Sequence, residues 1–222
     1  MTGSPVMDSA VAPAAHDAIA ADLYEQGWSV HPGLAGQRLT RVLAARARRW
    51  HTAGAFHRAG VGRGRGHAIR PDIRGDRVLW LDRVPDLPSV RLLQARLEGL
   101  RVAVNRRLFL GLEDYEGHFA LYPPGSAYRR HYDRFADGGR RTLTAILYLN
   151  EGWEPADGGQ LRLYPEDGPV VDVEPEAGTL ATFISAEMAH EVLATRRERL
   201  AVTGWFRRRP LGAGIPGSIS PG

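Results

Sequence analysis

The sequence predicts a β-rich α+β fold, in which helices from the first half of the chain support a core of short strands from the second half. Apolar residues recur at helical spacing in the first half. The second half contains short β-prone runs divided by Gly-containing turns such as Asp137-Gly-Gly and Asp157-Gly-Gly. Many short strands at near-regular spacing are typical of a sandwich, barrel or jelly roll. The sequence shows no repeat of fixed length, which argues against a propeller or solenoid.

The helical half contains three predicted helices. The first covers residues 17–26, a short amphipathic run. In the second, apolar side chains follow a period of 3.6 residues and form one face: Leu39, Val42, Leu43, Ala47 and Trp50. Pro88 and Ser89 open the third, because proline suits the first turn of a helix, and its apolar residues keep the same period to Val104.

Three segments are predicted to be flexible. Residues 1–12 are small and polar and lack the apolar run of a signal peptide, and residues 207–222 form an Arg-, Gly- and Pro-containing tail. The run of alternating glycines at 60–66 loses much backbone entropy on ordering and is expected to be a mobile loop. We therefore expect one domain over residues 13–206, with a helical part at 13–112 and a strand-forming part at 113–206.

The strand half contains six predicted strands. They are short, rich in β-branched and aromatic residues, and bounded by turn signals. Their ranges are 119–122, 142–149, 160–164, 170–173, 179–184 and 200–206. His190, in Met188-Ala-His-Glu-Val, lies in a further β-prone stretch.

Composition narrows the possible chemistry. The 222 residues include 29 basic and 25 acidic side chains, and every basic residue is arginine. Arginine binds phosphate well, but an arginine-only charge is also what a biased coding sequence with solvated side chains would give. The chain has no cysteine, which excludes disulfides, thiolate metal sites and cysteine nucleophiles. Any metal must bind to His, Asp or Glu. No apolar run is long enough to span a membrane.

A metal site is predicted around His131, Asp133 and His190. In an extended segment, His131 and Asp133 point to the same side. Two imidazoles and one carboxylate form the facial triad that leaves positions of an octahedral iron(II) open. Arg199 enters the apolar strand at 200–206, where a buried guanidinium needs an anion. The planar guanidinium of Arg199 would suit the carboxylate at the far end of a dicarboxylate that chelates the metal. The hydroxyl of Tyr148 could contact the same carboxylate.

This order of residues resembles the iron(II)/2-oxoglutarate dioxygenases. It resembles more closely the oxygen-sensing (hypoxia-inducible factor) prolyl hydroxylases and their bacterial relatives. The resemblance extends from about Asp72 to Phe206, and it implies a double-stranded β-helix, a form of jelly roll. The motifs that carry it lie at residues 72–80, 122–125, 128–133, 141–150, 158–162, 190–192 and 199–205.

The resemblance also implies roles for individual residues. Iron would be bound by His131, Asp133 and His190, and Arg199 would pair with the C5 carboxylate of 2-oxoglutarate. Tyr148 would hydrogen-bond the same carboxylate, and Tyr122 would lie beside the metal-binding end of the cosubstrate. Thr203, on the strand of Arg199, would also belong to the cosubstrate-binding residues.

On the substrate side, Arg74 and Asp76 match a mobile finger loop, here residues 60–76, that closes over a peptide. Tyr128, Arg141 and Trp205 match positions that line the peptide groove. His118 is interpreted as a structural residue, and Trp80 as a packing residue or a wall of the groove.

The resemblance implies an enzyme that hydroxylates a prolyl residue of a protein with iron(II), 2-oxoglutarate and O2, supported by ascorbate. Elongation factor Tu is the first candidate substrate. We expect a cytoplasmic monomer that binds neither nucleic acid nor membrane. Alternatives are oxidation of another protein residue, demethylation of nucleic acid, and a non-catalytic binding module. Nucleic-acid demethylases of this kind usually carry a second arginine at the position where this chain has Trp205. A binding module that had lost catalytic activity would be expected to lack one of the metal ligands.

Overall fold

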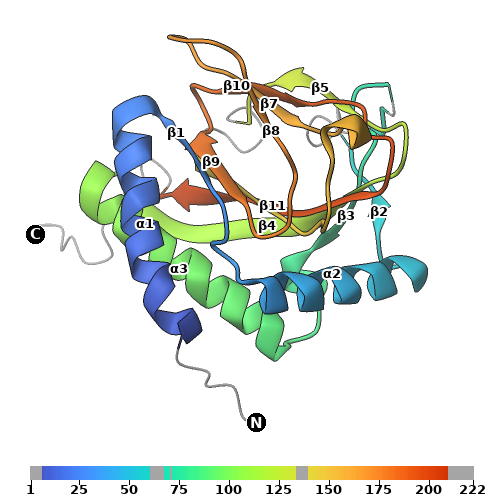
Figure 1. Cartoon of the computed structure of the whole chain (residues 1–222), viewed down its shortest axis with the longest axis horizontal. Coiled ribbons are helices and arrows are strands. Elements are labelled where there is room, and N and C mark those ends of the chain that lie inside the picture. Colours follow the sequence, from blue (N-terminus) through green and yellow to red (C-terminus); the bar gives the residue numbers. More distant parts are fainter. Residues whose placement is uncertain (1–6, 61–67, 71, 134–139, 210–222) are drawn as a thin grey trace, which may run out of the picture.

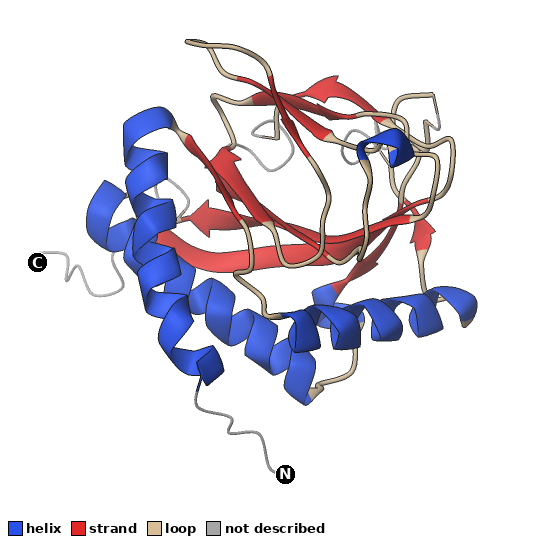
Figure 2. Cartoon of the chain, viewed as in Figure 1, coloured by secondary structure: helices blue, strands red, loops and turns tan. Residues whose placement is uncertain are grey.

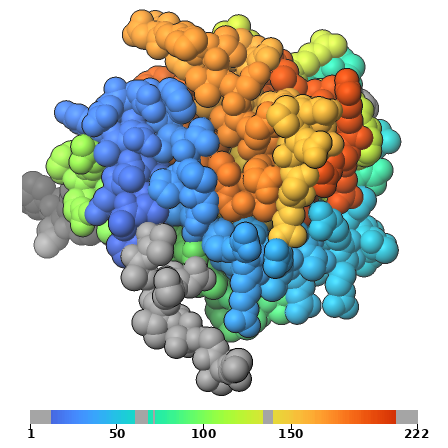
Figure 3. Space-filling model, viewed as in Figure 1, coloured from blue at the N-terminus to red at the C-terminus, as the bar shows by residue number. Residues whose placement is uncertain are grey.

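Two antiparallel sheets face each other, and three long helices cover the outer side of the larger sheet (Figures 1 and 2). The computed structural model describes residues 7–60, 68–70, 72–133 and 140–209. Residues 61–66 of the predicted mobile loop and most of the predicted tail lie outside these residues. In Figure 3 the N-terminal segments, in blue, cover one side of the molecule, and the strand-forming segments, in orange and red, form the other.

The three predicted helices are present as α1 (Met7–Gln26), α2 (Gln37–Thr52) and α3 (Pro88–Leu108). Helix α1 begins at Met7, within the segment to residue 12 that the sequence predicts to be flexible. The segment is rich in alanine, the strongest helix former, and this outweighs Pro13 inside the helix. Phe109 ends α3 in the left-handed conformation, with φ 54°.

The large sheet has the order β1-β9-β6-β11-β4-β3-β2, and the small sheet has the order β5-β10-β7-β8. The strands of the large sheet are β1 (Trp28–His31), β2 (His57–Arg58), β3 (Arg77–Trp80), β4 (Leu112–Tyr122), β6 (Arg141–Tyr148), β9 (Leu180–Ile184) and β11 (Arg199–Arg208). Those of the small sheet are β5 (Tyr128–His131), β7 (Leu161–Tyr164), β8 (Val171–Val173) and β10 (Ala189–Val192). Short 3-10 turns lie at Leu81–Arg83 and Pro155–Asp157.

The predicted strands differ from the observed ones at the sheet margins and in β4, which begins at Leu112 and not at residue 119. Strands β1, β2 and β3 come from the half of the chain that the sequence assigns to helices, and they are only two to four residues long. Strand β11 continues to Arg208, beyond the predicted start of the tail, because Arg207 and Arg208 still pair with Asp114 and Leu112 of β4. Strand pairing, rather than composition, thus sets this boundary.

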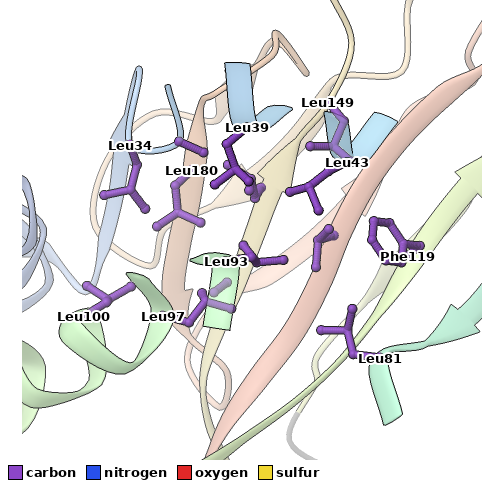
Figure 4. Close-up of a cluster of buried hydrophobic side chains, with 14 of the residues drawn as sticks. Leu34, Leu39, Leu43, Leu81, Leu93, Leu97, Leu100, Phe119, Leu149 and Leu180 are labelled. Atoms are coloured by element: carbon purple, nitrogen blue, oxygen red, sulfur yellow. The ribbon is translucent and has the colours of Figure 1, made fainter. Parts of the chain in front are cut away.

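The large sheet has one apolar face that packs against the helices. Along β4, Phe119 and Leu121 point to this face and are almost completely buried. Figure 4 shows Leu39 and Leu43 of α2 and Leu93 and Leu97 of α3 gathered beside the strands in the same cluster. Burial of such side chains supplies about 1.5–3 kcal/mol each. Packing of the helices against this face therefore stabilises the large sheet.

The opposite face of the large sheet is directed at the small sheet. Ala120 and Tyr122 of β4 and Ile146 and Tyr148 of β6 lie on this side, where a second buried cluster forms. Because side chains alternate along a strand, each central strand supplies one face to the core and one to the space between the sheets. The two facing sheets confirm the predicted β-rich jelly roll. Within the part of the chain that the structure describes, no helix is long and apolar enough to cross a membrane.

Candidate active site

A cavity of about 560 Å³ opens between the two sheets. It brings together almost all of the side chains that the sequence predicts for the site. Those that line it are His131, Asp133, His190, Arg199, Tyr122, Thr203, Arg74, Asp76, Tyr128, Arg141 and Trp205. Tyr148 does not line the cavity but lies behind it against Arg199, with 5.1 Å between its ring centroid and the guanidinium carbon.

The three predicted metal ligands meet at one end of the small sheet. His131 of β5 and His190 of β10 lie opposite each other in the antiparallel pair. Asp133 follows β5 by two residues, and its carboxylate lies 3.5 Å from Nε2 of His131 and 3.6 Å from Nε2 of His190. One ligand atom from each of the three residues lies within 4.8 Å of the other two. This spacing allows all three atoms to bind a single ion.

Backbone contacts aim both imidazoles at this point. Nδ1 of His131 lies 2.7 Å from the carbonyl oxygen of Arg129, and Nδ1 of His190 lies 3.1 Å from that of Met188. A carbonyl can only accept, so each Nδ1 carries a proton, and in the neutral form of the ring Nε2 keeps the lone pair that a metal needs. Burial lowers the pKa of His190 to about 4, which keeps this ring neutral and able to bind a metal at neutral pH.

The carboxylate of Asp133 is held by a small buried hydroxyl network. Thr144 Oγ1 donates a hydrogen bond to Asp133 Oδ2 at 2.9 Å and lies 2.8 Å from the hydroxyl of Ser185. Burial by itself would raise the pKa of Asp133, but the neighbouring imidazoles of His190 and His131 hold that pKa well below its usual range. The group is therefore ionised and oriented.

Arg199 is buried to 1% exposure beside the metal ligands. Its Nε donates to the carbonyl oxygen of Gly159 at 2.7 Å, and its guanidinium carbon lies 5.1 Å from the ring centroids of Tyr122 and Tyr148. Among the described residues, Nη2 of Arg199 and the hydroxyl of Tyr148 are both buried without a hydrogen-bond partner. Burial raises the pKa of Tyr148 to about 12, so its hydroxyl keeps a proton to donate. These two groups could each donate a hydrogen bond to a bound carboxylate.

Arg74 and Asp76 form a bidentate ion pair at the mouth of the cavity. Nε and Nη2 of Arg74 donate to the two carboxylate oxygens of Asp76 at 2.6 and 2.9 Å. The guanidinium of Arg74 also lies 4.8 Å from the ring centroid of Tyr128, which in turn stacks on His131 at 3.7 Å. This chain of contacts connects the C-terminal end of the predicted finger loop to a metal-ligand candidate. Residues 61–67 and 71 of that loop lie outside the described residues.

Arg141 and Trp205 form a second wall. The guanidinium carbon of Arg141 lies 3.4 Å from the ring centroid of Trp205, and its Nε donates to Glu116 at 2.8 Å. Thr203 lies two residues before Trp205 on β11 and points into the same cavity. The wall is therefore an aromatic surface covered by a fixed cation.

Comparison with known proteins assigns the family. A family model of the 2OG-Fe(II) oxygenase superfamily matches residues 117–207. The crystal structure of a prolyl-4-hydroxylase from Pseudomonas putida has 48% sequence identity to this chain and a TM-score of 0.80, covering 87% of this chain and 99% of that one. The chain belongs to the 2OG-Fe(II) oxygenase superfamily.

Other relatives of this oxygenase include proteins named as prolyl hydroxylases. The hypoxia-inducible factor prolyl hydroxylase of Caenorhabditis elegans is 32% identical over 198 residues, which cover 83% of this chain and 27% of the relative. Human Egl nine homolog 1 is 34% identical, covering 61% of this chain and 33% of the relative. The oxygenase thus spans about a quarter to a third of the length of these two proteins. A Trichoplax adhaerens prolyl hydroxylase, 24% identical with a TM-score of 0.82, shares the fold.

The residues of this oxygenase fit the two groups that name the superfamily. Two imidazoles with free Nε2 atoms and one ionised carboxylate are a donor set suited to iron(II) that leaves other positions open. The unpartnered Nη2 of Arg199 and hydroxyl of Tyr148 fit the far carboxylate of 2-oxoglutarate.

Sequence reasoning missed several groups that position the site. Thr144 shares the inward face of β6 with Tyr148, so strand periodicity could have found it. Ser185, Glu116 and the carbonyl of Gly159 reach Thr144, Arg141 and Arg199 from other strands and loops. No local pattern indicates these contacts. The cavity also includes His118, which the sequence suggests is structural.

Proposed function

We propose that this oxygenase is an iron(II)- and 2-oxoglutarate-dependent dioxygenase that hydroxylates a prolyl residue of a protein. The observation that carries the proposal is the metal-ligand triad beside a buried arginine with an unused donor. The 48% identity to a bacterial prolyl-4-hydroxylase supports this choice among the reactions of the superfamily.

In this proposal the two halves of the cavity have separate tasks. His131, Asp133 and His190 hold iron(II), while Arg199 and Tyr148 bind the far carboxylate of 2-oxoglutarate. When bound, iron(II), 2-oxoglutarate and O2 supply the oxidising chemistry, in which 2-oxoglutarate is converted to succinate and CO2. The protein orients the reactants and excludes water, since the whole site lies between two packed sheets.

The remaining walls of the cavity would hold the peptide. Tyr128, Trp205, Arg141 and the Arg74–Asp76 pair surround the metal-ligand candidates on the open side. The Trichoplax adhaerens enzyme, which shares the fold, is described in complex with a hypoxia-inducible factor peptide fragment. A peptide bound across this face would present one proline to the metal.

Elongation factor Tu is the first substrate to test, because it is the candidate that the sequence resemblance suggests. The purified oxygenase would be incubated with elongation factor Tu, iron(II), 2-oxoglutarate and ascorbate, and peptides would be examined by mass spectrometry. A gain of one oxygen on proline supports the proposal. A gain on another residue type would assign the chain to a different protein oxygenase, and no gain by an active enzyme would reject this substrate.

The oxygenase activity itself is tested with ligand variants. His131→Ala and Asp133→Ala should abolish succinate formation from 2-oxoglutarate, whereas His51→Ala, which changes a histidine outside the cavity, should leave it unchanged. Succinate formation that survives both ligand changes would overturn the assignment.

A further inference from the structure

His118 is a buried histidine whose ring nitrogens form no hydrogen bond among the described residues. It lies on β4 with 1% exposure and lines the cavity. Among the described residues, neither Nδ1 nor Nε2 of its ring has a hydrogen-bond partner. A buried polar group without a partner costs about 1–3 kcal/mol, so a ring with two such atoms needs an explanation.

The position of His118 separates it from the cosubstrate end. Tyr122, which contacts Arg199, lies four residues further along β4, a distance of about 13 Å in a strand. His118 pairs instead with Thr203 of β11 and Trp80 of β3. It therefore lies in a different part of the cavity from Arg199.

Two tryptophans fix the ring in place. The His118 centroid lies 4.9 Å from that of Trp80 and 5.6 Å from that of Trp205. The guanidinium carbon of Arg141 also lies 3.4 Å from the ring centroid of Trp205. A ring held between large aromatic side chains has little freedom to turn away, so its nitrogens are already oriented before any ligand arrives.

The surroundings of His118 determine the charge of its ring. Burial, together with the nearby cations Arg74 and Arg141, keeps the pKa of His118 well below its usual range, so the ring is neutral. A neutral imidazole has one N–H donor and one acceptor nitrogen. The N–H of such a ring can donate to a ligand oxygen that carries partial negative charge.

A prolyl segment supplies such an oxygen. Proline has no backbone N–H, so the peptide around it offers more carbonyl acceptors than amide donors. We propose that His118 is a substrate-positioning residue whose ring N–H donates a hydrogen bond to a backbone carbonyl of the bound peptide beside the target proline. This inference rests on the proposed function, because it needs a peptide substrate.

Steady-state kinetics of His118 variants test the inference. The probes are purified elongation factor Tu and a library of short synthetic peptides that each contain one central proline. His118→Phe removes the donor and keeps an aromatic ring, and His118→Gln keeps an amide donor. His31→Phe is the matched control, since His31 lies in the same sheet with a buried, unpartnered Nδ1 but outside the cavity.

His118→Phe should raise the KM for the best peptide or protein substrate about 10-fold, the loss expected when a buried carbonyl is left without its donor. The KM for 2-oxoglutarate should stay as in the wild type. His118→Gln should recover part of the loss, and His31→Phe should behave as wild type. If the phenylalanine variant does not fold, His118→Leu repeats the measurement.

An unchanged peptide KM in a folded His118→Phe variant would overturn the inference, as would an equal rise in the KM for 2-oxoglutarate. In both cases the wild type still hydroxylates proline, so the proposed function stands. If the wild type consumes 2-oxoglutarate but oxidises no prolyl probe, the proposed function fails and the inference fails with it.

Discussion

Replacing Arg199 with methionine should remove 2-oxoglutarate binding while the fold is kept. Methionine fills similar space and adapts to irregular gaps, so the cavity wall can repack. The change removes the guanidinium whose Nη2 is unpartnered among the described residues. It also removes the hydrogen bond from Nε to the carbonyl of Gly159.

The size of the effect follows from burial. Arg199 is 1% exposed, so a bound carboxylate would form its ion pair out of contact with water. Removing one partner of such a pair costs about 3–5 kcal/mol, and each 1.4 kcal/mol is a factor of about ten in affinity. We therefore expect the Kd for 2-oxoglutarate to rise by between about one hundred and several thousand times.

Calorimetric titration of 2-oxoglutarate into the Mn(II)-loaded protein measures this change without turnover. Two matched variants should weaken 2-oxoglutarate binding by smaller amounts. Arg199→Lys keeps the charge but loses the planar fork, and should lie between wild type and Arg199→Met. Tyr148→Phe removes only the hydroxyl and should weaken binding about 10-fold, because hydrogen bonds to charged groups contribute about 1.5–3 kcal/mol.

Near-normal 2-oxoglutarate affinity in a folded Arg199→Met variant would refute this reasoning. The same holds if Arg199→Lys and Arg199→Met are equally weak while Tyr148→Phe is weaker than both. Circular dichroism and Tm of each variant establish that the fold is intact before titration.

Three further changes test how the site and the fold are built. Thr144→Val should raise the Kd for Mn(II) about 10- to 100-fold, since it removes the hydrogen bond that orients Asp133; an unchanged metal Kd would contradict the role. Gly159→Ala should raise the KM for 2-oxoglutarate about 10-fold, because φ is +70° and the new Cβ would lie 3.1 Å from Cδ of Arg199; an unchanged KM would show that the loop adjusts freely. Phe109→Gly should raise the Tm by about 2–4 °C, because it relieves about 1 kcal/mol of left-handed strain at a side chain that is 86% exposed; a lower Tm would show that the ring stabilises the fold.

Local patterns were enough to locate the helices and the longer strands. The period of Leu39, Leu43 and Ala47 predicted α2, because a helix on the surface of a sheet must bury one face. The β-prone run after Arg199 predicted β11 for the equivalent reason in a strand. Strands of two to four residues, such as β2 and β3, carry too short a pattern for any period to be detected. Their pairing partners, not their composition, define them.

The sequence by itself determined the chemistry of this protein. It excluded thiolate ligands, set His131, Asp133 and His190 in an order that could form an iron(II) site, and placed one arginine within an apolar strand. Residue types and short spacings are local properties, so they can be recognised without coordinates.

Only the tertiary structure decided how the site is held. Asp133 depends on Thr144 and Ser185, and Arg199 depends on the carbonyl of Gly159, all of them from other strands or loops. It also placed His118 in the cavity with two unused nitrogens, where the sequence suggested a structural residue. Such roles arise because sheet register brings residues far apart in the chain into contact, and no local pattern encodes that register.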